Sequence, residues 1–347
     1  PMGEAHAGQT AALAGLSARP GERIGDGFGL EAPETVPLMS VQVEPTAPLT
    51  QSALLAHLRE MEEEDPLLSV RPEADGVSVG VMGAVQVEVL QGMLAARFGD
   101  VVRMCPPHVL YKETIAAPVV GIGHYEPLRH YAEVWLKLEP GAPGSGISFE
   151  ADCPPNSLDE NWQRLIRTHV FERAHPGVLT GSPLCDVRIR LIAGRAHLKH
   201  TEGGDFREAT CRAIRNALMQ AENVLLEPVV RFELAMPNEA LARVTGELLR
   251  IGAQLDASET DGGETTLTGR CTAAMFWDYP TRFAASTRGH GRIASRFDRY
   301  EPCVVRQIGY DPLADTLNPP GSVFCSHGAG FYVAWDHVRE WAHCEVE

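Results

Sequence analysis

The sequence lacks several features that would assign it to common classes of protein. No apolar run approaches the roughly 18 to 20 residues of a membrane-spanning helix, and no basic segment followed by an apolar stretch opens the chain. Neither a membrane protein nor a signal peptide is therefore expected. The chain has only three lysines, none of which follows a glycine, so the Gly-Lys pair of a phosphate-binding loop is missing. An Asn-Lys-x-Asp segment that reads guanine is missing as well. We therefore do not expect this chain to bind or hydrolyse GTP.

Paired cysteines are also absent. The eight cysteines stand alone, without a Cys-x-x-Cys pair, which is typical of reduced thiols and predicts a cytoplasmic protein. A zinc site could be assembled from residues near the end of the chain, which are Cys303, Cys325, His327, His337, His343 and Cys344. Because the short paired spacings of zinc motifs are missing, we expect no metal and no other cofactor in this chain. A metal-dependent enzyme built on this end is the least favoured hypothesis.

Basic residues are scarce overall but locally concentrated. A net charge of −16 excludes a protein that coats nucleic acid through bulk electrostatics. Residues 186–215 nevertheless hold seven basic residues against four acidic ones, and residues 281–300 hold five arginines against one aspartate. Local basic contact points on an acidic body are typical of a transient RNA partner. Arginines on the solvent-exposed face of a helix or strand, with no binding role, would give the same pattern.

The length of 347 residues predicts two or three domains rather than one core. The N-terminal Pro1-Met2-Gly3-Glu4 does not look like a natural start, so we expect a piece of a longer protein. Residues 1–37 place many glycines between short apolar pieces, which is typical of turn-dense β structure. They are too short to close a sheet and are interpreted as the end of a β domain.

Residues 38–113 show the alternation of element types that a split βαβ unit requires. Apolar residues follow a strand period in four segments and a helical period in two. The expected elements are a strand at 38–43, a helix at 48–63, strands at 67–71 and 77–81, a helix at 84–98 and a strand at 101–104. The second helix is expected to bury Val85, Val89, Leu90 and Met93. The order β-α-β-β-α-β predicts a ferredoxin-like domain.

The same order returns in residues 226–303. Its expected elements are a strand at 229–235, a helix at 238–252, strands at 255–257 and 265–269, a helix at 275–286 and a strand at 293–300. A different α/β block lies between the two units, with a strand at 130–138, a helix at 158–171, a strand at 186–193, a loop at 194–204 and a further helix. Asp205 is the expected N-cap of that helix, and Gly194, Gly203 and Gly204 are the expected hinges of the loop. The fold class predicted is α+β and multidomain.

Five short motifs follow one another along the chain. They are Glu62-Glu63-Glu64-Asp65-Pro66-Leu67, the helix start within 81–89, Leu225-Leu226-Glu227-Pro228, Thr287-Arg288-Gly289-His290-Gly291-Arg292 and Phe297-Asp298-Arg299-Tyr300-Glu301-Pro302. In this order they resemble the C-terminal part of a translational GTPase of the elongation factor G and tetracycline ribosomal-protection type. The resemblance covers residues 38–303 and the segment before them.

The resemblance implies a division into domains. Residues 1–37 would be the C-terminal end of a β-barrel domain II, 38–113 a ferredoxin-like domain III, 114–225 the ribosome-inserting domain IV, 226–303 a ferredoxin-like domain V and 304–347 a C-terminal extension. Domain IV would be a central α/β domain similar to domain 2 of ribosomal protein S5, flanked by the two ferredoxin-like domains.

The same resemblance implies a function. The chain would be the ribosome-binding portion of a translation factor or ribosomal protection protein, with no catalytic residue of its own. GTP and magnesium would be bound by a domain of the intact protein. The expected partners are ribosomal RNA and ribosomal proteins, the expected state is a monomer, and no membrane partner is expected. The alternative is a stand-alone regulator that binds the ribosome or another RNA without a nucleotide.

The resemblance also implies which residues contact RNA. The domain IV tip would contact the ribosome through a loop that contains His197, Leu198, Lys199, His200 and Thr201, and a second loop at the same tip would contain His124 and Tyr125. In domain V the expected RNA contacts are Arg288, His290 and Arg292, where glycines let the backbone approach a phosphate. A solvated loop, a tyrosine packed on a strand and ordinary turn glycines are the alternative interpretations.

One segment resembles the ribosomal-protection group in particular. Asp205-Phe206-Arg207 and the tail after Tyr300 are similar to that group, which releases tetracycline from the small subunit. The tip loop lacks the Tyr-Ser-Pro sequence of characterised resistance factors. The resemblance therefore implies tetracycline resistance, but the sequence of the tip loop does not support it.

Overall fold

The computed structural model describes residues 4, 6, 8, 9, 15, 37–73, 76–304 and 309–345. They form two compact units, Pro1–Val109 with Ala274–His290, and Leu110–Ala273 with Gly291–Glu347. The predicted end of a β-barrel domain at residues 1–37 lies almost wholly outside the described residues. Among the helices of the described part, none is both long and apolar enough to cross a membrane. All eight cysteines are free.

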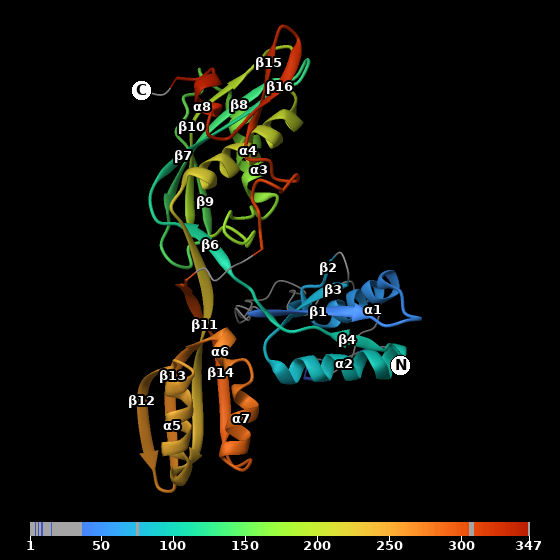
Figure 1. Ribbon diagram of the computed structural model, residues 1–347, viewed down its shortest axis with the longest axis vertical. Coiled ribbons are helices and arrows are strands. Elements are labelled where there is room, and N and C mark those ends of the chain that lie inside the picture. Colours follow the sequence, from blue (N-terminus) through green and yellow to red (C-terminus); the bar gives the residue numbers. More distant parts are fainter. Residues whose placement is uncertain are drawn as a thin grey trace. The chain divides into compact units, whose positions relative to one another are not determined.

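The first unit contains the predicted split βαβ arrangement. Its elements are β1 (Met39–Pro45), α1 (Gln51–Glu64), η1 (Pro66–Leu68), β2 (Arg71–Pro72), β3 (Val77–Val81), α2 (Ala84–Phe98), β4 (Val102–Met104) and β5 (His108–Val109). The strands are ordered β2-β3-β1-β4 (Figure 1). Strand β5 also pairs with β1. In this order the first and last strands of the repeat are neighbours, as the ferredoxin-like fold requires.

The face that α2 buries differs from the prediction. Leu90 and Leu94 are buried, whereas Val85, Val89 and Met93 are exposed. Both sets have the spacing of four residues that brings side chains onto one helical face. The prediction is confirmed for Leu90 and wrong for Val85, Val89 and Met93, because periodicity alone could not choose between two apolar faces of the same helix.

The second split βαβ unit has the same strand order. Its elements are β11 (Asn223–Pro237), η2 (Asn238–Ala240), α5 (Leu241–Arg250), β12 (Gln254–Asp261), β13 (Glu264–Thr272), α6 (Ala273–Phe276), α7 (Tyr279–Ser286) and β14 (Arg292–Pro302). The sheet is ordered β12-β13-β11-β14, and β6 (Lys112–Ile115) pairs with the start of β11. The long strand β11 thus pairs at its start with β6, which precedes the central sheet, and along the rest of its length with β13 and β14.

The central domain is a six-stranded sheet with α3 and α4 on one face and the short α8 on the other. Its elements are β7 (Val119–Tyr125), β8 (Ala132–Pro140), β9 (Ile147–Ala151), α3 (Glu160–Phe171), β10 (Val187–Ala196), α4 (Gly203–Gln220), β15 (Ser322–Ser326), β16 (Ala329–Val333) and α8 (Val338–Trp341). The strand order is β16-β15-β7-β8-β10-β9. Residues 322–333 therefore add two strands to this sheet, next to β7 (Figure 1).

Two separate hydrophobic cores lie on the two faces of this sheet. On one face α4 packs directly onto β7, where a Cβ at Gly121 or Gly123 would lie 2.0 Å and 1.9 Å from carbonyl oxygens of α4. The glycines are needed because the helix backbone occupies the space of a side chain. The alternate residues Ile122 and Trp135 face the other way, where Phe324 from the C-terminal strands packs against them.

Candidate functional site

One end of the central sheet brings together the elements that carry the predicted tip. Strand β7 ends there, β8 begins there, and β10 leads into α4 through residues 197–202. Strand β10 runs to Ala196, three residues beyond its predicted end. Gly194 therefore lies inside the strand, where a Cβ would meet the Leu158 side chain at 2.7 Å. It makes room for that side chain and is no hinge of the loop.

The tip loop is closed by its own hydrogen bonds. The backbone N–H groups of His200 and Thr201 both donate to the carbonyl oxygen of His197, over 3.2 Å and 3.1 Å. The N–H of His197 donates to the Thr201 hydroxyl oxygen at 2.7 Å. That hydroxyl in turn donates to the carbonyl oxygen of Tyr131 at 2.6 Å. Thr201 thus anchors the loop to the segment that leads into β8.

The loop carries two stacked histidine rings and one fully exposed apolar side chain. The imidazoles of His197 and His200 lie 4.6 Å apart, 16° from parallel. Leu198 is fully exposed and Lys199 is exposed. Flat rings, a positive charge and an apolar contact are the groups that bind unpaired bases and phosphates of RNA. The loop can therefore offer all three to a nucleic acid.

The start of α4 fixes one side of the loop. Glu202 is the N-cap, and Asp205 occupies the third helical position, where it accepts from the Glu202 N–H at 2.8 Å. Together they form a reciprocal capping box. Asp205 is therefore not the N-cap that was predicted. Its other oxygen lies 2.8 Å from Nδ1 of His130, on the loop before β8. Gly203 and Gly204 belong to the first helical turn.

The prediction for His124 is wrong, because this residue lies within β7 and is fully buried. Its ring stacks on Phe324 at 4.1 Å. A side chain without exposed surface cannot contact RNA. The residues that cover it come from strand β15 and from the end of the chain, about 200 positions later, and sequence spacing gives no sign of them. Tyr125 ends the same strand and is half-buried, with the Arg212 guanidinium 5.7 Å from its ring.

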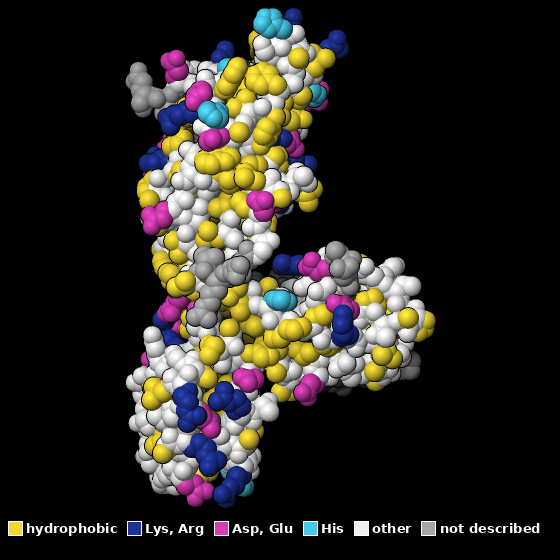
Figure 2. All heavy atoms as spheres, viewed as in Figure 1, with side chains coloured by type: hydrophobic (Ala, Val, Ile, Leu, Met, Phe, Trp, Pro, Cys, Tyr) yellow, Lys and Arg dark blue, Asp and Glu magenta, His cyan; other side chains and the backbone are white. Residues whose placement is uncertain are grey.

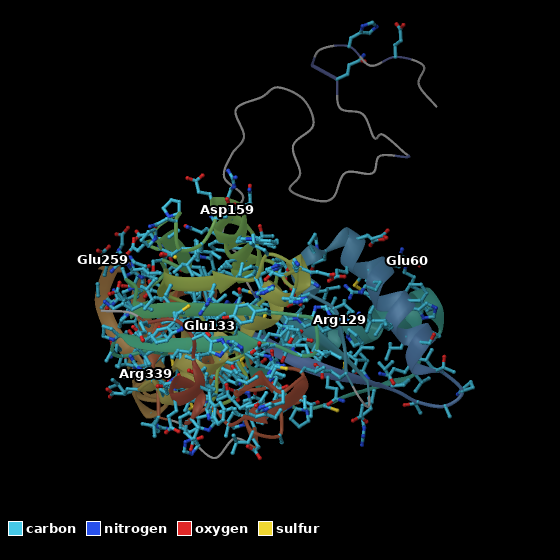
Figure 3. All side chains as sticks on the ribbon, turned by 90° about the horizontal axis from the view of Figure 1, so that it is seen from above. Glu60, Arg129, Glu133, Asp159, Glu259 and Arg339 are labelled. Carbon is cyan, nitrogen blue, oxygen red and sulfur yellow. The ribbon has the colours of Figure 1, made fainter. Side chains whose placement is uncertain are left out.

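A buried carboxylate that the sequence analysis missed lies beside His124. Oε2 of Glu133 is 2.7 Å from Nδ1 of His124, and Oε1 accepts from the indole N–H of Trp135 at 2.8 Å. Backbone N–H groups of His343 and Cys344 donate to the same carboxylate. Burial by itself raises the pKa of Glu133, but the hydrogen bonds outweigh it and lower the pKa to about 2. Figure 3 labels Glu133 on its strand.

The three predicted residues of domain V do not share one environment. Arg288 adopts a left-handed backbone conformation with φ of 52°. Both Arg288 and His290 are exposed. Arg292 begins β14 and is exposed as well, but its guanidinium donates to the Glu264 carboxylate at 2.8 Å. A phosphate at Arg292 would therefore compete with an existing ion pair.

A groove on domain V adds arginines that were not singled out as site residues. It has a volume of about 610 Å³, and its lining includes Arg231, Arg270 and Arg296. Asp298 lies 3.6 Å from the first and 3.4 Å from the second, so part of the positive charge is compensated. Figure 2 shows basic side chains gathered on the domain that holds β11 to β14, where all of them are arginines. Of the three groove arginines, only Arg296 belongs to the basic segment at 281–300.

Two family models and one solved structure are similar to this chain. Residues 107–222 match the family model for elongation factor G, domain IV, and residues 224–306 match that for the elongation factor G C-terminus. A protein from Thermus thermophilus, known from its crystal structure, is similar with 25% sequence identity and a TM-score of 0.64. The match covers 80% of this chain and 43% of that one, so this chain spans less than half of its relative. The chain therefore carries domain IV and the C-terminal domain of the elongation factor G family.

Proposed function

We propose that this chain is the ribosome-binding portion of a translation factor and that it inserts the tip of domain IV toward the decoding centre. The observation that carries the proposal is an exposed, self-closed loop at residues 197–201 on a domain that matches elongation factor G domain IV. Loops on rigid elements are where binding residues concentrate. Here β10 and α4 supply the rigid support.

The chemistry of the loop favours RNA as its direct partner. The stacked rings of His197 and His200 offer a surface for an unpaired base, and Lys199 offers a charge to a phosphate. Leu198 projects beyond them without packing on the domain. In domain V, Arg288 and His290 are the further contacts, whereas Arg292 would first have to leave Glu264.

The intact factor would couple this binding to GTP hydrolysis. In this proposal GTP and magnesium are bound by a domain outside the chain, which itself contributes no catalytic residue. The factor acts as a monomer in the cytoplasm, with ribosomal RNA and ribosomal proteins as partners. A stand-alone regulator would instead act without any nucleotide. Assays of translation with the chain alone separate the two, because only the regulator would act without a further domain of its own that binds GTP.

A finer assignment, to the ribosomal-protection group, rests on two features. The first is Asp205-Phe206-Arg207 after the tip loop. The second is the tail after Tyr300, whose strands β15 and β16 extend the domain IV sheet next to β7. Expression of the intact factor in a tetracycline-sensitive bacterium tests this assignment. Unchanged tetracycline sensitivity with the factor present on ribosomes would limit the function to ordinary translation.

Co-sedimentation with purified ribosomal subunits tests the ribosome-binding proposal. The chain is expected to bind weakly, with an affinity that falls as salt is raised, because phosphate contacts release counterions. Reversing the charge of Arg288 and Arg292 to glutamate should weaken binding further. Arg243→Glu, on the exposed side of α5 outside both basic segments, is the matched control. Binding that stays the same from low to high salt would contradict the proposal.

A further inference from the structure

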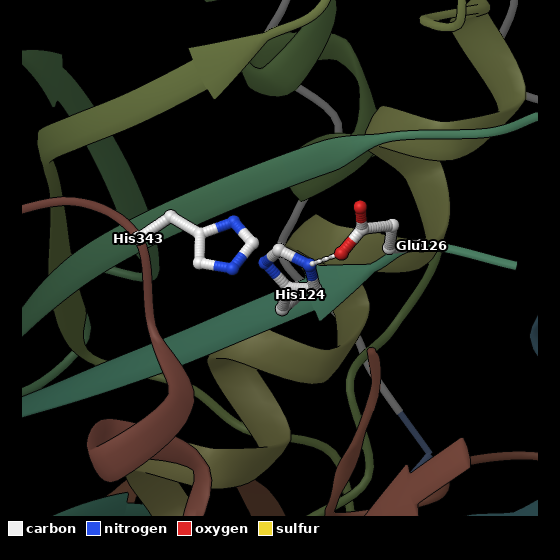
Figure 4. A group of neighbouring side chains, drawn as sticks. All are labelled: His124, Glu126 and His343. Carbon is white, nitrogen blue, oxygen red and sulfur yellow. Dashed lines mark hydrogen bonds and ion pairs between the residues drawn. The ribbon is translucent and has the colours of Figure 1, made fainter. Parts of the chain in front are cut away.

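Three side chains with metal-binding atoms meet at the tip end of the central domain. They are His124 on β7, Glu126 directly after this strand, and His343 from the segment that follows α8 (Figure 4). One ligand atom from each lies within 4.8 Å of the others. We propose that these residues bind a divalent transition-metal ion of the zinc class. This inference is independent of ribosome binding.

The donor set has the composition that zinc prefers. Two imidazole nitrogens and one carboxylate oxygen form a recurrent three-ligand set for zinc, with water completing the tetrahedron. Calcium and magnesium need six or more oxygen ligands, which this group does not supply. The set therefore favours zinc, cobalt or nickel over the hard cations.

The spacing fits with small side-chain adjustments. Metal–ligand bonds of about 2.0 to 2.1 Å in a tetrahedron place the ligand atoms roughly 3.3 Å apart. Nε2 of His124 and Oε2 of Glu126 are 3.0 Å apart, close to that value. His124 is fixed by burial, whereas Glu126 is partly exposed and His343 is exposed. The two movable ligands can therefore close on an ion that the fixed one holds.

A second layer of partners orients both imidazoles. Glu133 lies 2.7 Å from Nδ1 of His124, which directs Nε2 of this ring toward the proposed ion. The Tyr131 hydroxyl lies 3.1 Å from Nδ1 of His343, which leaves Nε2 of that ring for the metal. A hydrogen-bond partner behind each ligating histidine, often a carboxylate, is the arrangement found around protein metal sites. This second layer supports the proposal independently of the ligand spacing.

Charge balance also favours a divalent cation. Two carboxylates, Glu126 and Glu133, flank the buried ring of His124. A divalent cation held between them would balance the charge of both carboxylates.

The ion would tie distant parts of the chain together. His343 follows His124 by more than 200 residues, and its backbone N–H already donates to Glu133 at 2.8 Å. A metal at this point would fasten the C-terminal segment to the sheet next to the tip loop. Because a metal that binds only the folded state stabilises it, the melting temperature should rise with zinc concentration.

Zinc titration of the chelator-treated chain tests the proposal. Calorimetry and elemental analysis should give one ion per chain with a Kd of about 1 μM or tighter. Glu126→Gln and His343→Gln should each weaken binding at least about 100-fold and abolish the zinc-dependent rise in melting temperature. His337→Gln is the control, because this exposed histidine caps α8 outside the group. Retention of wild-type affinity in both ligand variants, or no zinc binding by the wild type, would overturn the proposal.

Two further measurements separate this site from its alternatives. Tyr131→Phe removes only the hydroxyl behind His343 and should weaken zinc binding about 10- to 100-fold, with His343 itself retained. Cobalt substituted for zinc should give a spectrum without thiolate charge-transfer absorption. A thiolate band would assign the metal to a cysteine such as Cys344 and overturn the proposed ligand set.

Discussion

Glu133 on β8 and His124 on β7 are cross-strand partners whose side chains meet inside domain IV, with Oε2 of the glutamate 2.7 Å from Nδ1 of the histidine. Neither side chain has exposed surface. The other contacts of Glu133 are the indole of Trp135 and the backbone N–H groups of His343 and Cys344. One buried carboxylate therefore joins two strands to the C-terminal segment.

Glu133→Gln is expected to lower the free energy of unfolding by about 3 kcal/mol or more, because it removes a buried carboxylate that accepts hydrogen bonds from Trp135, His343 and Cys344 and contacts Nδ1 of His124. It also turns an amide NH₂ toward groups that donate hydrogen bonds. Urea unfolding followed by circular dichroism measures the loss. Glu150→Gln, an exposed position on β9 of the same sheet, should change stability by less than about 0.5 kcal/mol. Equal effects of the two variants would contradict this role of Glu133.

Gly123→Ala is expected to destabilise the protein by about 1 to 3 kcal/mol, because the new Cβ would lie 1.9 Å from the Ala209 carbonyl oxygen of α4. The helix would have to move off the sheet. Gly204→Ala is the matched control, since a Cβ there meets nothing within 4 Å and alanine favours helix by up to about 1 kcal/mol. Thermal melts should show opposite shifts. A Gly123→Ala variant that melts with the wild type would contradict the close packing.

Replacing His197, Lys199 and His200 by alanine is expected to leave the melting temperature nearly unchanged, since exposed substitutions rarely exceed about 0.5 kcal/mol. The anchor from Thr201 to the carbonyl of Tyr131 remains in this variant. Binding to the small ribosomal subunit should fall about tenfold or more. Arg188→Ala, near the opposite end of β10, removes one exposed positive charge and serves as the control. A large drop in melting temperature with binding preserved would make the loop a structural element instead.

Stability is expected to fall as pH drops below about 6.5, in part through His175. Burial lowers the pKa of His175, while its hydrogen bond to the Val170 carbonyl, 2.9 Å long, opposes the shift. The unfolded chain therefore takes up the proton first, and folding stability is lost as pH falls through the unfolded pKa of about 6.5. His175→Gln can keep a hydrogen bond without titrating. Urea unfolding from pH 7.5 to 5.5 should show a shallower decline for this variant, and parallel curves would contradict the assignment.

Regular elements with clear boundaries could be predicted from the sequence. The helix expected at 84–98 is α2 with the same bounds, because Gly83 precedes it as N-cap and Gly99 ends it in a left-handed conformation with φ of 72°. The β-α-β-β-α-β order of both ferredoxin-like units was confirmed by the strand order of each sheet. Local signals were sufficient in these cases, because caps and periodicity act over a few residues.

Features that depend on distant residues could not be predicted. His124 follows two glycines and precedes a loop, which suggested an exposed turn, but the glycines make room for α4. Its burial depends on Phe324 and on the segment around His343. The tip loop at 197–201 was located by the resemblance, whereas its anchor on Tyr131 needed the structure. Contacts across long sequence separations are decided by packing, which periodicity does not encode.

Site-specific cross-linking tests most directly whether the tip of domain IV contacts ribosomal RNA. A photo-reactive amino acid replaces the fully exposed Leu198, and the same group replaces Leu249 on the exposed side of α5 as the control. After irradiation of the chain bound to ribosomes, the probe at 198 should be found attached to RNA of the small subunit, and the probe at 249 should not. A chain that stays bound to ribosomes while the probe at 198 attaches to no RNA would contradict the account.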